Sequence, residues 1–276
     1  MVKMGTVWDR TAEFISDNLG VILPIALISF FVPASIEGNF PAARDTASAG
    51  LELVLSLISV AFALLSLWGT LALIAMAADA NATADAGNVA RRRLLPALAV
   101  WIALMLVLFV LFLGVPLLLA LGGQDPGLLI ATGDMALDLP PALAWAVALY
   151  CIALVLFLIW AAARLMPLSP LIVHERRMFD AIRRSFALTR GHVLAIVGVL
   201  LLFLLMLVVA RSAALWVFGS IFRLIAGGED GVTLAGVLTS VTVAAVQTAF
   251  AVIAAVFQAK LYVALVSECE RAVSPA

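Results

Sequence analysis

The chain has 276 residues, of which 65% are hydrophobic and only 12% carry charge. A soluble domain usually has about 25% charged residues because its exterior must be polar. This composition argues against a soluble enzyme or a nucleic-acid-binding protein, and the net charge of -1 gives no general attraction for polyanions. It predicts a single integral membrane domain that covers residues 1–276.

Apolar runs long enough to cross a membrane occur six times. A hydrocarbon core about 30 Å thick requires roughly 20 apolar residues in a helix. The runs cover residues 19–36, 51–78, 94–121, 141–163, 192–219 and 232–259. None of them alternates with a period of two, as the strands of a membrane barrel do. The predicted fold class is therefore all-α: a polytopic membrane bundle of six transmembrane helices, arranged as three outward–inward hairpins.

The first run can be read as a retained span or as a cleaved signal peptide. The segment before it contains Asp9, Glu13 and Asp17, whereas a signal peptide begins with basic residues. The run also contains Pro24 and Pro33, which a membrane helix tolerates when neighbouring groups bond to the freed backbone. A retained first span is the favoured interpretation.

Two polar segments are predicted to form amphipathic helices at the membrane interface, at residues 6–18 and 175–190. The second places Met178, Phe179, Ile182 and Phe186 on one side. Its other side carries four arginines: Arg176, Arg177, Arg183 and Arg184. A basic amphipathic helix can lie in the interface, so these arginines are predicted to contact lipid headgroups, including anionic phospholipid. The alternative is that they only fix the orientation of the chain.

Lysine and arginine are distributed unequally between the two sets of connections. The N-terminal segment, the loops 79–93 and 164–191, and the C-terminal end together hold thirteen of them, whereas the other side has only Arg44 and Arg223. Cytoplasmic connections are enriched in these residues. The sequence therefore predicts a protein of the bacterial inner membrane with both termini in the cytoplasm.

Polar residues within the runs allow two interpretations. Gln247 and Gln258 share a helix face with small alanines, and Ser59 and Ser66 form a similar edge in the second run. Small and polar residues favour close helix packing, but the same four residues could line a substrate cavity. Arg211, near the outer end of the fifth run, either extends to the interface or pairs with Glu52, which begins the second run at the same face.

Groups of residues typical of catalytic or metal sites are missing from the sequence. Two cysteines and two histidines do not provide a zinc-site spacing, and we find no Gly-rich phosphate loop and no Gly-x-Ser-x-Gly elbow. We therefore expect no metal, no cofactor and no catalytic residues, and an intramembrane enzyme is the least favoured class.

One stretch resembles a known family. It consists of Met166-Pro167-Leu168-Ser169-Pro170-Leu171-Ile172-Val173-His174-Glu175, followed by Asp180-Ala181-Ile182-Arg183-Arg184-Ser185-Phe186-Ala187-Leu188-Thr189-Arg190-Gly191-His192. This stretch is similar to the membrane domain associated with bacterial glycerophosphoryl diester phosphodiesterases and to related stand-alone six-span proteins. The resemblance implies an inner-membrane module linked to lipid or envelope physiology. It does not imply phosphodiesterase activity, because the catalytic barrel of about 250 residues has no counterpart in this sequence.

The function expected from the sequence is that of a non-enzymatic inner-membrane protein that interacts with lipids or with partner proteins, including a second copy of itself. The alternative is a small-molecule or lipid transporter with a polar cavity between its helices. No nucleic-acid partner is expected.

Overall fold

The computed structural model of the chain describes residues 3–44, 47–79, 85–123, 127, 140–175, 179–226 and 233–273. Within these residues every regular element is a helix and no strand occurs. The elements are α1 (Met4–Asp17), α2 (Leu19–Ala26), the π-helix η1 (Leu27–Phe31), α3 (Val32–Glu37), α4 (Phe40–Arg44), α5 (Ala49–Ala78), α6 (Ala86–Phe112), α7 (Gly114–Leu121), α9 (Pro141–Leu165), α10 (Leu168–His174), α11 (Asp180–Leu188), α12 (Val193–Ala213), the π-helix η3 (Ala214–Phe218), α13 (Gly219–Ala226) and α14 (Leu234–Val273).

Six helical stretches are long and apolar enough to cross a membrane, which confirms the predicted fold class. They are Leu19–Glu37, Ala49–Ala78, Ala86–Leu121, Pro141–His174, Val193–Ile225 and Leu234–Arg271. Several are longer than the roughly 20 residues that a bilayer requires. The longest single helix, α14, has 40 residues, or about 60 Å at 1.5 Å per residue.

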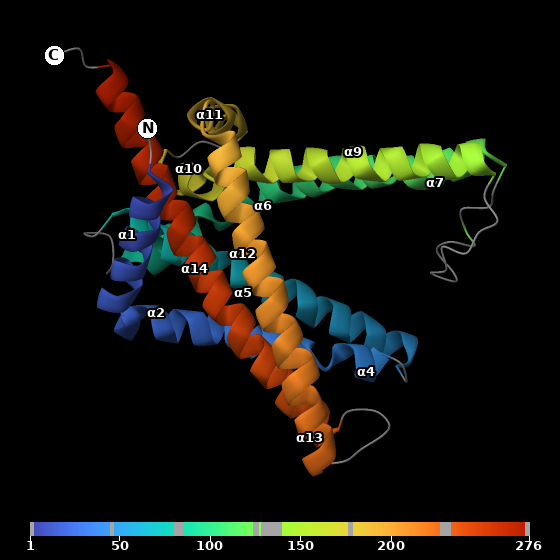
Figure 1. Cartoon of the computed structure of the whole chain (residues 1–276). Coiled ribbons are helices and arrows are strands. Elements are labelled where there is room, and N and C mark those ends of the chain that lie inside the picture. The colour runs from blue at the N-terminus through green and yellow to red at the C-terminus, as the bar shows by residue number, and fades with distance from the viewer. Residues whose placement is uncertain are drawn as a thin grey trace.

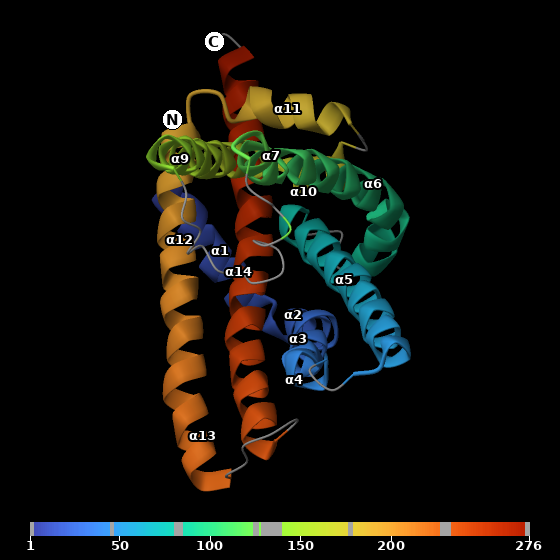
Figure 2. The same cartoon turned by 90° about the vertical axis from the view of Figure 1, so that its right-hand side faces the viewer.

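The spans form three hairpins that diverge from one common region (Figure 1). The first hairpin joins α2, η1 and α3 to α5, the second joins α6 and α7 to α9, and the third joins α12, η3 and α13 to α14. We call the common region the junction; it contains α1, α10, α11 and the C-terminal end of α14. The far ends of the hairpins are the tips, and the second and third hairpins point in different directions (Figures 1 and 2).

The hydrophobic core lies at the junction. Its centre is the end of α5, where every residue from Leu71 to Ala77 is buried. All residues from Leu168 to Val173 of α10 are also buried, and α6 and α14 complete the core. This proline-containing stretch was predicted to belong to the connection 164–191, so its position in the core is a correction.

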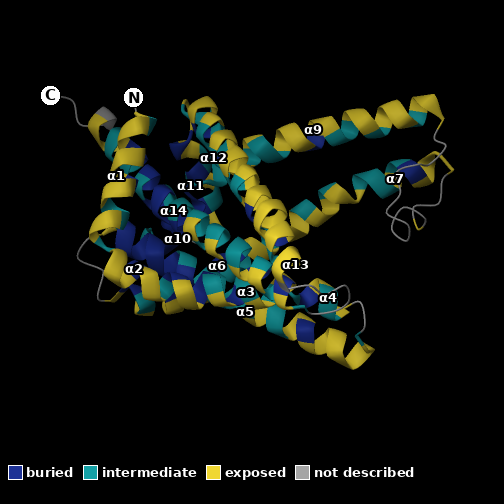
Figure 3. Cartoon of the chain, turned by 60° about the horizontal axis from the view of Figure 1, so that its bottom comes forward, coloured by how far each residue is buried: buried dark blue, intermediate teal, exposed yellow. Residues whose placement is uncertain are grey.

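The spans differ strongly in how much protein covers them. In the most apolar part of each span, 44% of the residues of α14 are buried, against none in the fourth span and 6% in the third and the fifth. Figure 3 shows this contrast, with exposed residues along α9 and buried ones on α14 and α10. The second hairpin and α12 therefore present most of their apolar side chains to the outside of the chain.

Both predicted amphipathic helices exist, but their apolar sides pack against protein. In α1, Val7 and Thr11 are buried, and Trp8 lies against Phe257 of α14 with ring centroids 6.0 Å apart. The second helix, α11, begins only at Asp180, and Ile182 packs against the junction core. Neighbouring helices thus cover Val7 and pack against Ile182, whereas Trp8 and Phe179 are exposed. Contact of the exposed residues with lipid stays a prediction.

A π-helical turn in the first span has a chemical cause. Pro33 has no N–H to donate to the carbonyl four residues earlier, that of Ser29. In its place the Ser66 hydroxyl of α5 donates to the Ser29 carbonyl at 2.8 Å. The predicted tolerance of proline in this span thus depends on a neighbouring helix.

Candidate functional site

The junction holds a chain of polar contacts, which we call the junction cluster: His174, Glu175, Arg184 and Tyr262. The rings of His174 and Tyr262 stack with centroids 5.9 Å apart. The Tyr262 hydroxyl donates to Oε1 of Glu175 at 3.4 Å, and Nε of Arg184 lies 3.6 Å from the same oxygen. These contacts join α10, α11 and α14 where the sequence offered no catalytic motif.

A small cavity of about 470 Å³ lies beside the junction cluster. Its lining includes four charged residues and one imidazole: Asp79, Asp85, Arg92, Arg93 and His174. Nε2 of His174 is buried and has no hydrogen-bond partner. The acidic and basic residues balance in number, so the cavity lacks a net charge that would select an anion or a cation. Within the described ranges, no group of three or more His, Cys, Asp or Glu side chains could hold a metal ion.

Arg164, at the end of α9, attaches α11 to the junction. Its guanidinium lies 5.6 Å from the ring centroids of both Trp160 and Phe186. Nη1 donates to the Phe186 carbonyl at 2.8 Å and to Oγ1 of Thr189 at 3.4 Å. In return, the Ser185 hydroxyl donates to the Arg164 carbonyl at 2.5 Å. Arg164 was predicted only to be a residue of the loop 164–191, so its role in holding α11 was missed.

The four arginines predicted to meet lipid headgroups do not share one environment. Arg176 and Arg177 lie outside the described residues. Arg183 is exposed on the outer side of α11, whereas Arg184 turns toward Glu175 and is only partly exposed. Of the described pair, Arg183 is the more exposed, and headgroup contact by either arginine stays a prediction.

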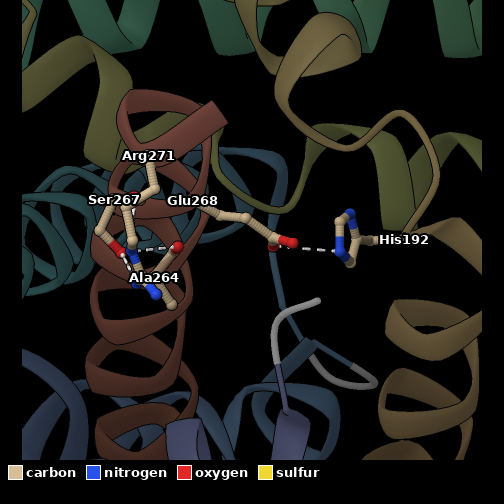
Figure 4. A network of polar contacts seen from close by, with 5 residues as sticks. All are labelled: His192, Ala264, Ser267, Glu268 and Arg271. Carbon is tan, nitrogen blue, oxygen red and sulfur yellow. Dashed lines mark hydrogen bonds and ion pairs between the residues drawn. The ribbon is translucent and has the colours of Figure 1, made fainter. Parts of the chain in front are cut away.

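A second polar contact ties the start of the third hairpin to its end. Nε2 of His192, just before α12, lies 3.2 Å from Oε2 of Glu268 on α14, close enough for an ion pair when the imidazole is protonated. Figure 4 shows Glu268 reaching toward His192, with Ser267 and Arg271 beside it on α14. The Arg271 side chain donates to the Ser267 carbonyl at 3.1 Å and so stays on its own helix.

A cavity of about 1230 Å³ lies between the tips of the first and third hairpins; we call it the tip cavity. Its charged and polar lining comes from α3, α12, α13, α14 and the residues just outside these helices. The lining side chains with polar groups are Glu37, Arg211, Trp216, Ser220, Arg223, Thr233, Thr239, Ser240 and Gln247. The remaining lining residues are glycines and apolar side chains, among them Leu215 and Leu224.

Close contacts fix the first hairpin against the third beside this cavity. Nδ2 of Asn39 donates to Oγ of Ser240 at 2.9 Å, and Ser240 in turn donates to the Ser35 carbonyl at 3.2 Å. A Cβ added to Gly38 would lie 2.6 Å from Cβ of Ser240, so the backbones approach as closely as glycine allows.

The four predicted intramembrane polar residues differ in their surroundings. Gln247 lines the tip cavity, Ser66 bonds to the first span, and Ser59 and Gln258 line neither of the two cavities described above. The interpretation of these four residues as one substrate pathway gains no support from these cavities and stays a prediction. For Ser66, the alternative interpretation as a packing contact is confirmed.

The predicted pair between Glu52 and Arg211 is also wrong. Both residues are described, and no ion pair joins them: Arg211 lines the tip cavity, and Glu52 is exposed in the first turn of α5. In Figure 2, α14 lies between α12 and α5, so matched depth in the membrane did not place the two residues on adjacent helices.

No protein-family model, no curated protein and no solved structure matches the chain. The resemblance to the membrane domain associated with glycerophosphoryl diester phosphodiesterases therefore rests on its short matching stretch alone.

Proposed function

We propose that the protein is a non-enzymatic module of the bacterial inner membrane whose function is to interact with lipids. The observation that carries this proposal is the exposure of the second hairpin and of α12, whose apolar residues are almost uncovered by protein. In a membrane, lipid chains fill the space between diverging hairpins unless another protein does. A resemblance to a membrane domain of lipid-related enzymes points in the same direction.

Native mass spectrometry of the purified protein tests this proposal. We expect a monomer that carries several retained phospholipids after mild detergent extraction, because lipids occupy the exposed hairpin surfaces. The proposal is wrong if the purified protein carries no lipid and its mass corresponds to a dimer or to a complex with another protein. That result would indicate a protein-binding role instead.

The arginines around α11 are proposed to contact anionic headgroups. Each basic residue near an anionic leaflet contributes about 1 kcal/mol to the attraction for anionic lipid. Replacing three of them should therefore reduce the ratio of retained phosphatidylglycerol to phosphatidylethanolamine severalfold. The variant is Arg176→Gln, Arg177→Gln and Arg183→Gln, which leaves the contact between Arg184 and Glu175 intact. The control is Arg44→Gln, which removes a basic residue at a tip. An unchanged ratio would leave these arginines with a role in topology only.

Both termini are proposed to lie in the cytoplasm, on the basis of the unequal distribution of lysine and arginine. Cys269 is exposed near the C-terminal end of α14 and is a natural reporter for the junction. In a Cys151→Ser background, an impermeant thiol reagent should label Cys269 only after the cells are opened. In a variant without native cysteines, Ser220→Cys at the third tip should react in intact cells. The opposite pattern would invert the proposed orientation.

Transport is the second candidate, and the size of the tip cavity favours it. Proteoliposomes that contain the protein and accelerate the exchange of fluorescent phospholipid between leaflets would support this candidate over a lipid-binding module. An exchange rate equal to that of empty liposomes would speak against it.

A further inference from the structure

The tip cavity has a mixed polar and apolar lining that includes two exposed arginines. Arg211 and Arg223 both line it, and neither forms an ion pair with any residue in the part of the chain that the structure describes. A guanidinium near hydrocarbon is stable only when it is paired, hydrogen-bonded or able to reach water. An anionic group from outside the chain would satisfy this requirement.

A π-helical turn brings the two arginines to the same side of the fifth span. They are 12 residues apart, which in a regular α-helix would separate them by about 120° around the axis. The turn η3, Ala214–Phe218, lies between them and adds one residue to the helix. The separation then falls to about 20°, so Arg211 and Arg223 both face the cavity. Turns of this kind are frequent at functional sites.

The register of the third hairpin gives the two arginines different surroundings. Phe203 meets Phe250 edge to face, with ring centroids 5.3 Å apart, and a Cβ added to Gly219 would meet Thr239 at 3.4 Å. Between these two contacts, Arg211 lies opposite the stretch of α14 from Val243 to Gln247, and both of these residues line the cavity. Arg223 lies about 17 Å farther along the helix, near the tip. The Arg211 guanidinium and the Gln247 carboxamide line the same cavity and provide several N–H donors for the oxygens of a phosphate.

We propose that the tip cavity binds the headgroup of an anionic phospholipid, with Arg211 and Gln247 holding its phosphate. Arg223 draws the anion toward the cavity from the tip. Glu37, which also lines the cavity, opposes anion binding and limits its strength. The volume of about 1230 Å³ exceeds the roughly 300–1,000 Å³ of typical small-molecule pockets and suits a lipid headgroup with the first part of its chains.

The test is a titration of the purified protein in neutral detergent with phosphatidylglycerol or phosphatidylcholine, followed by native mass spectrometry. The wild type should bind one phosphatidylglycerol molecule more tightly than the others and more tightly than phosphatidylcholine. Arg211→Gln should weaken this site about fivefold and Arg223→Gln less. Glu37→Gln should strengthen it, which a purely structural role would not do. The matched control is Arg44→Gln, an exposed arginine of α4 that does not line the cavity.

Each outcome separates the possible ligands. The proposal is overturned if the wild type binds both phospholipids equally. It is also overturned if the wild type and Arg211→Gln bind phosphatidylglycerol equally. If Arg211→Gln does not fold, the opposite signs expected for Arg223→Gln and Glu37→Gln still decide it. Displacement by soluble glycerol 3-phosphate at similar concentration would show that the cavity takes a free phosphate ester and overturns the lipid assignment. This site is at the tips, whereas the headgroup contacts in the proposed function are at α11. Either proposal can therefore be wrong while the other is correct.

Discussion

Replacing Gly69 by leucine is expected to separate the two helices of the first hairpin. Gly69 is buried in α5, and a Cβ placed there would overlap Cβ of Ser29 and lie 2.7 Å from its Oγ. The nearest atoms belong to a short side chain on the π-helical turn η1, which cannot move away without moving the backbone. Overpacking of this kind costs about 1–3 kcal/mol for modest additions, and leucine adds four carbons.

The measurement is the thermal unfolding of the purified protein in detergent. Gly69→Leu should lower the transition temperature strongly, and Gly69→Ala should lower it less. Gly198→Leu is the matched control, because Gly198 also lies within a span but has no heavy atom within 4 Å of the added Cβ. If both leucine variants unfold at the same temperature, the close approach of α5 to η1 is not present in the protein.

Replacing Arg164 by glutamine is expected to release α11 from the junction. The Arg164→Gln variant loses the charge-assisted hydrogen bond to the Phe186 carbonyl, which is worth about 1.5–3 kcal/mol. It also loses the contact of the guanidinium with two aromatic rings, which is worth about 0.5–2 kcal/mol. Glutamine cannot replace the two together, and lysine lacks the planar group that lies between Trp160 and Phe186. The variants Arg164→Gln and Arg164→Lys should therefore both release α11.

Hydrogen exchange of the backbone amides of residues 180–188 measures this release. A loss of about 2 kcal/mol corresponds to exchange roughly thirty times faster for amides that exchange through local opening. The control is Arg190→Gln, which removes an equal charge from an exposed position after the same helix. Unchanged exchange in Arg164→Gln would mean that Ala181, Leu188 and the other buried residues of α11 hold the helix without the arginine.

Hydrophobicity and charge were sufficient to predict the six spans, because a bilayer imposes a minimum length on each helix. They were not sufficient to predict which residues meet. Pairing Glu52 with Arg211 used depth alone, and depth says nothing about which helices are neighbours. The same limit applies to Ser66 and Gln247, which share a polar character, although Ser66 bonds to the first span and Gln247 lines the tip cavity.

The grouping of Arg211 with Arg223, which the sequence analysis did not predict, did leave a signal in the sequence. Four residues that line the tip cavity recur every four positions: Arg211, Leu215, Gly219 and Arg223. In a regular α-helix this spacing drifts around the axis, but a π-helical turn between the two arginines keeps them on one side. The position of that turn depends on packing between hairpins, so only the structure gives it. For α11, the amphipathic pattern was correct, but the sequence could not say whether protein or lipid covers the apolar side.

The length and composition of α14 have a mechanical consequence. From Val237 to Val273 the helix contains neither glycine nor proline, the residues at which helices most often kink. One end carries Ser240 and Gln247 beside the tip cavity, and the other carries Tyr262 and Glu268 at the junction. A rod about 60 Å long that tilts by about 5° about one end moves its other end by about 5 Å. A tilt of α14 that begins at the tips therefore displaces the end of the helix at the junction.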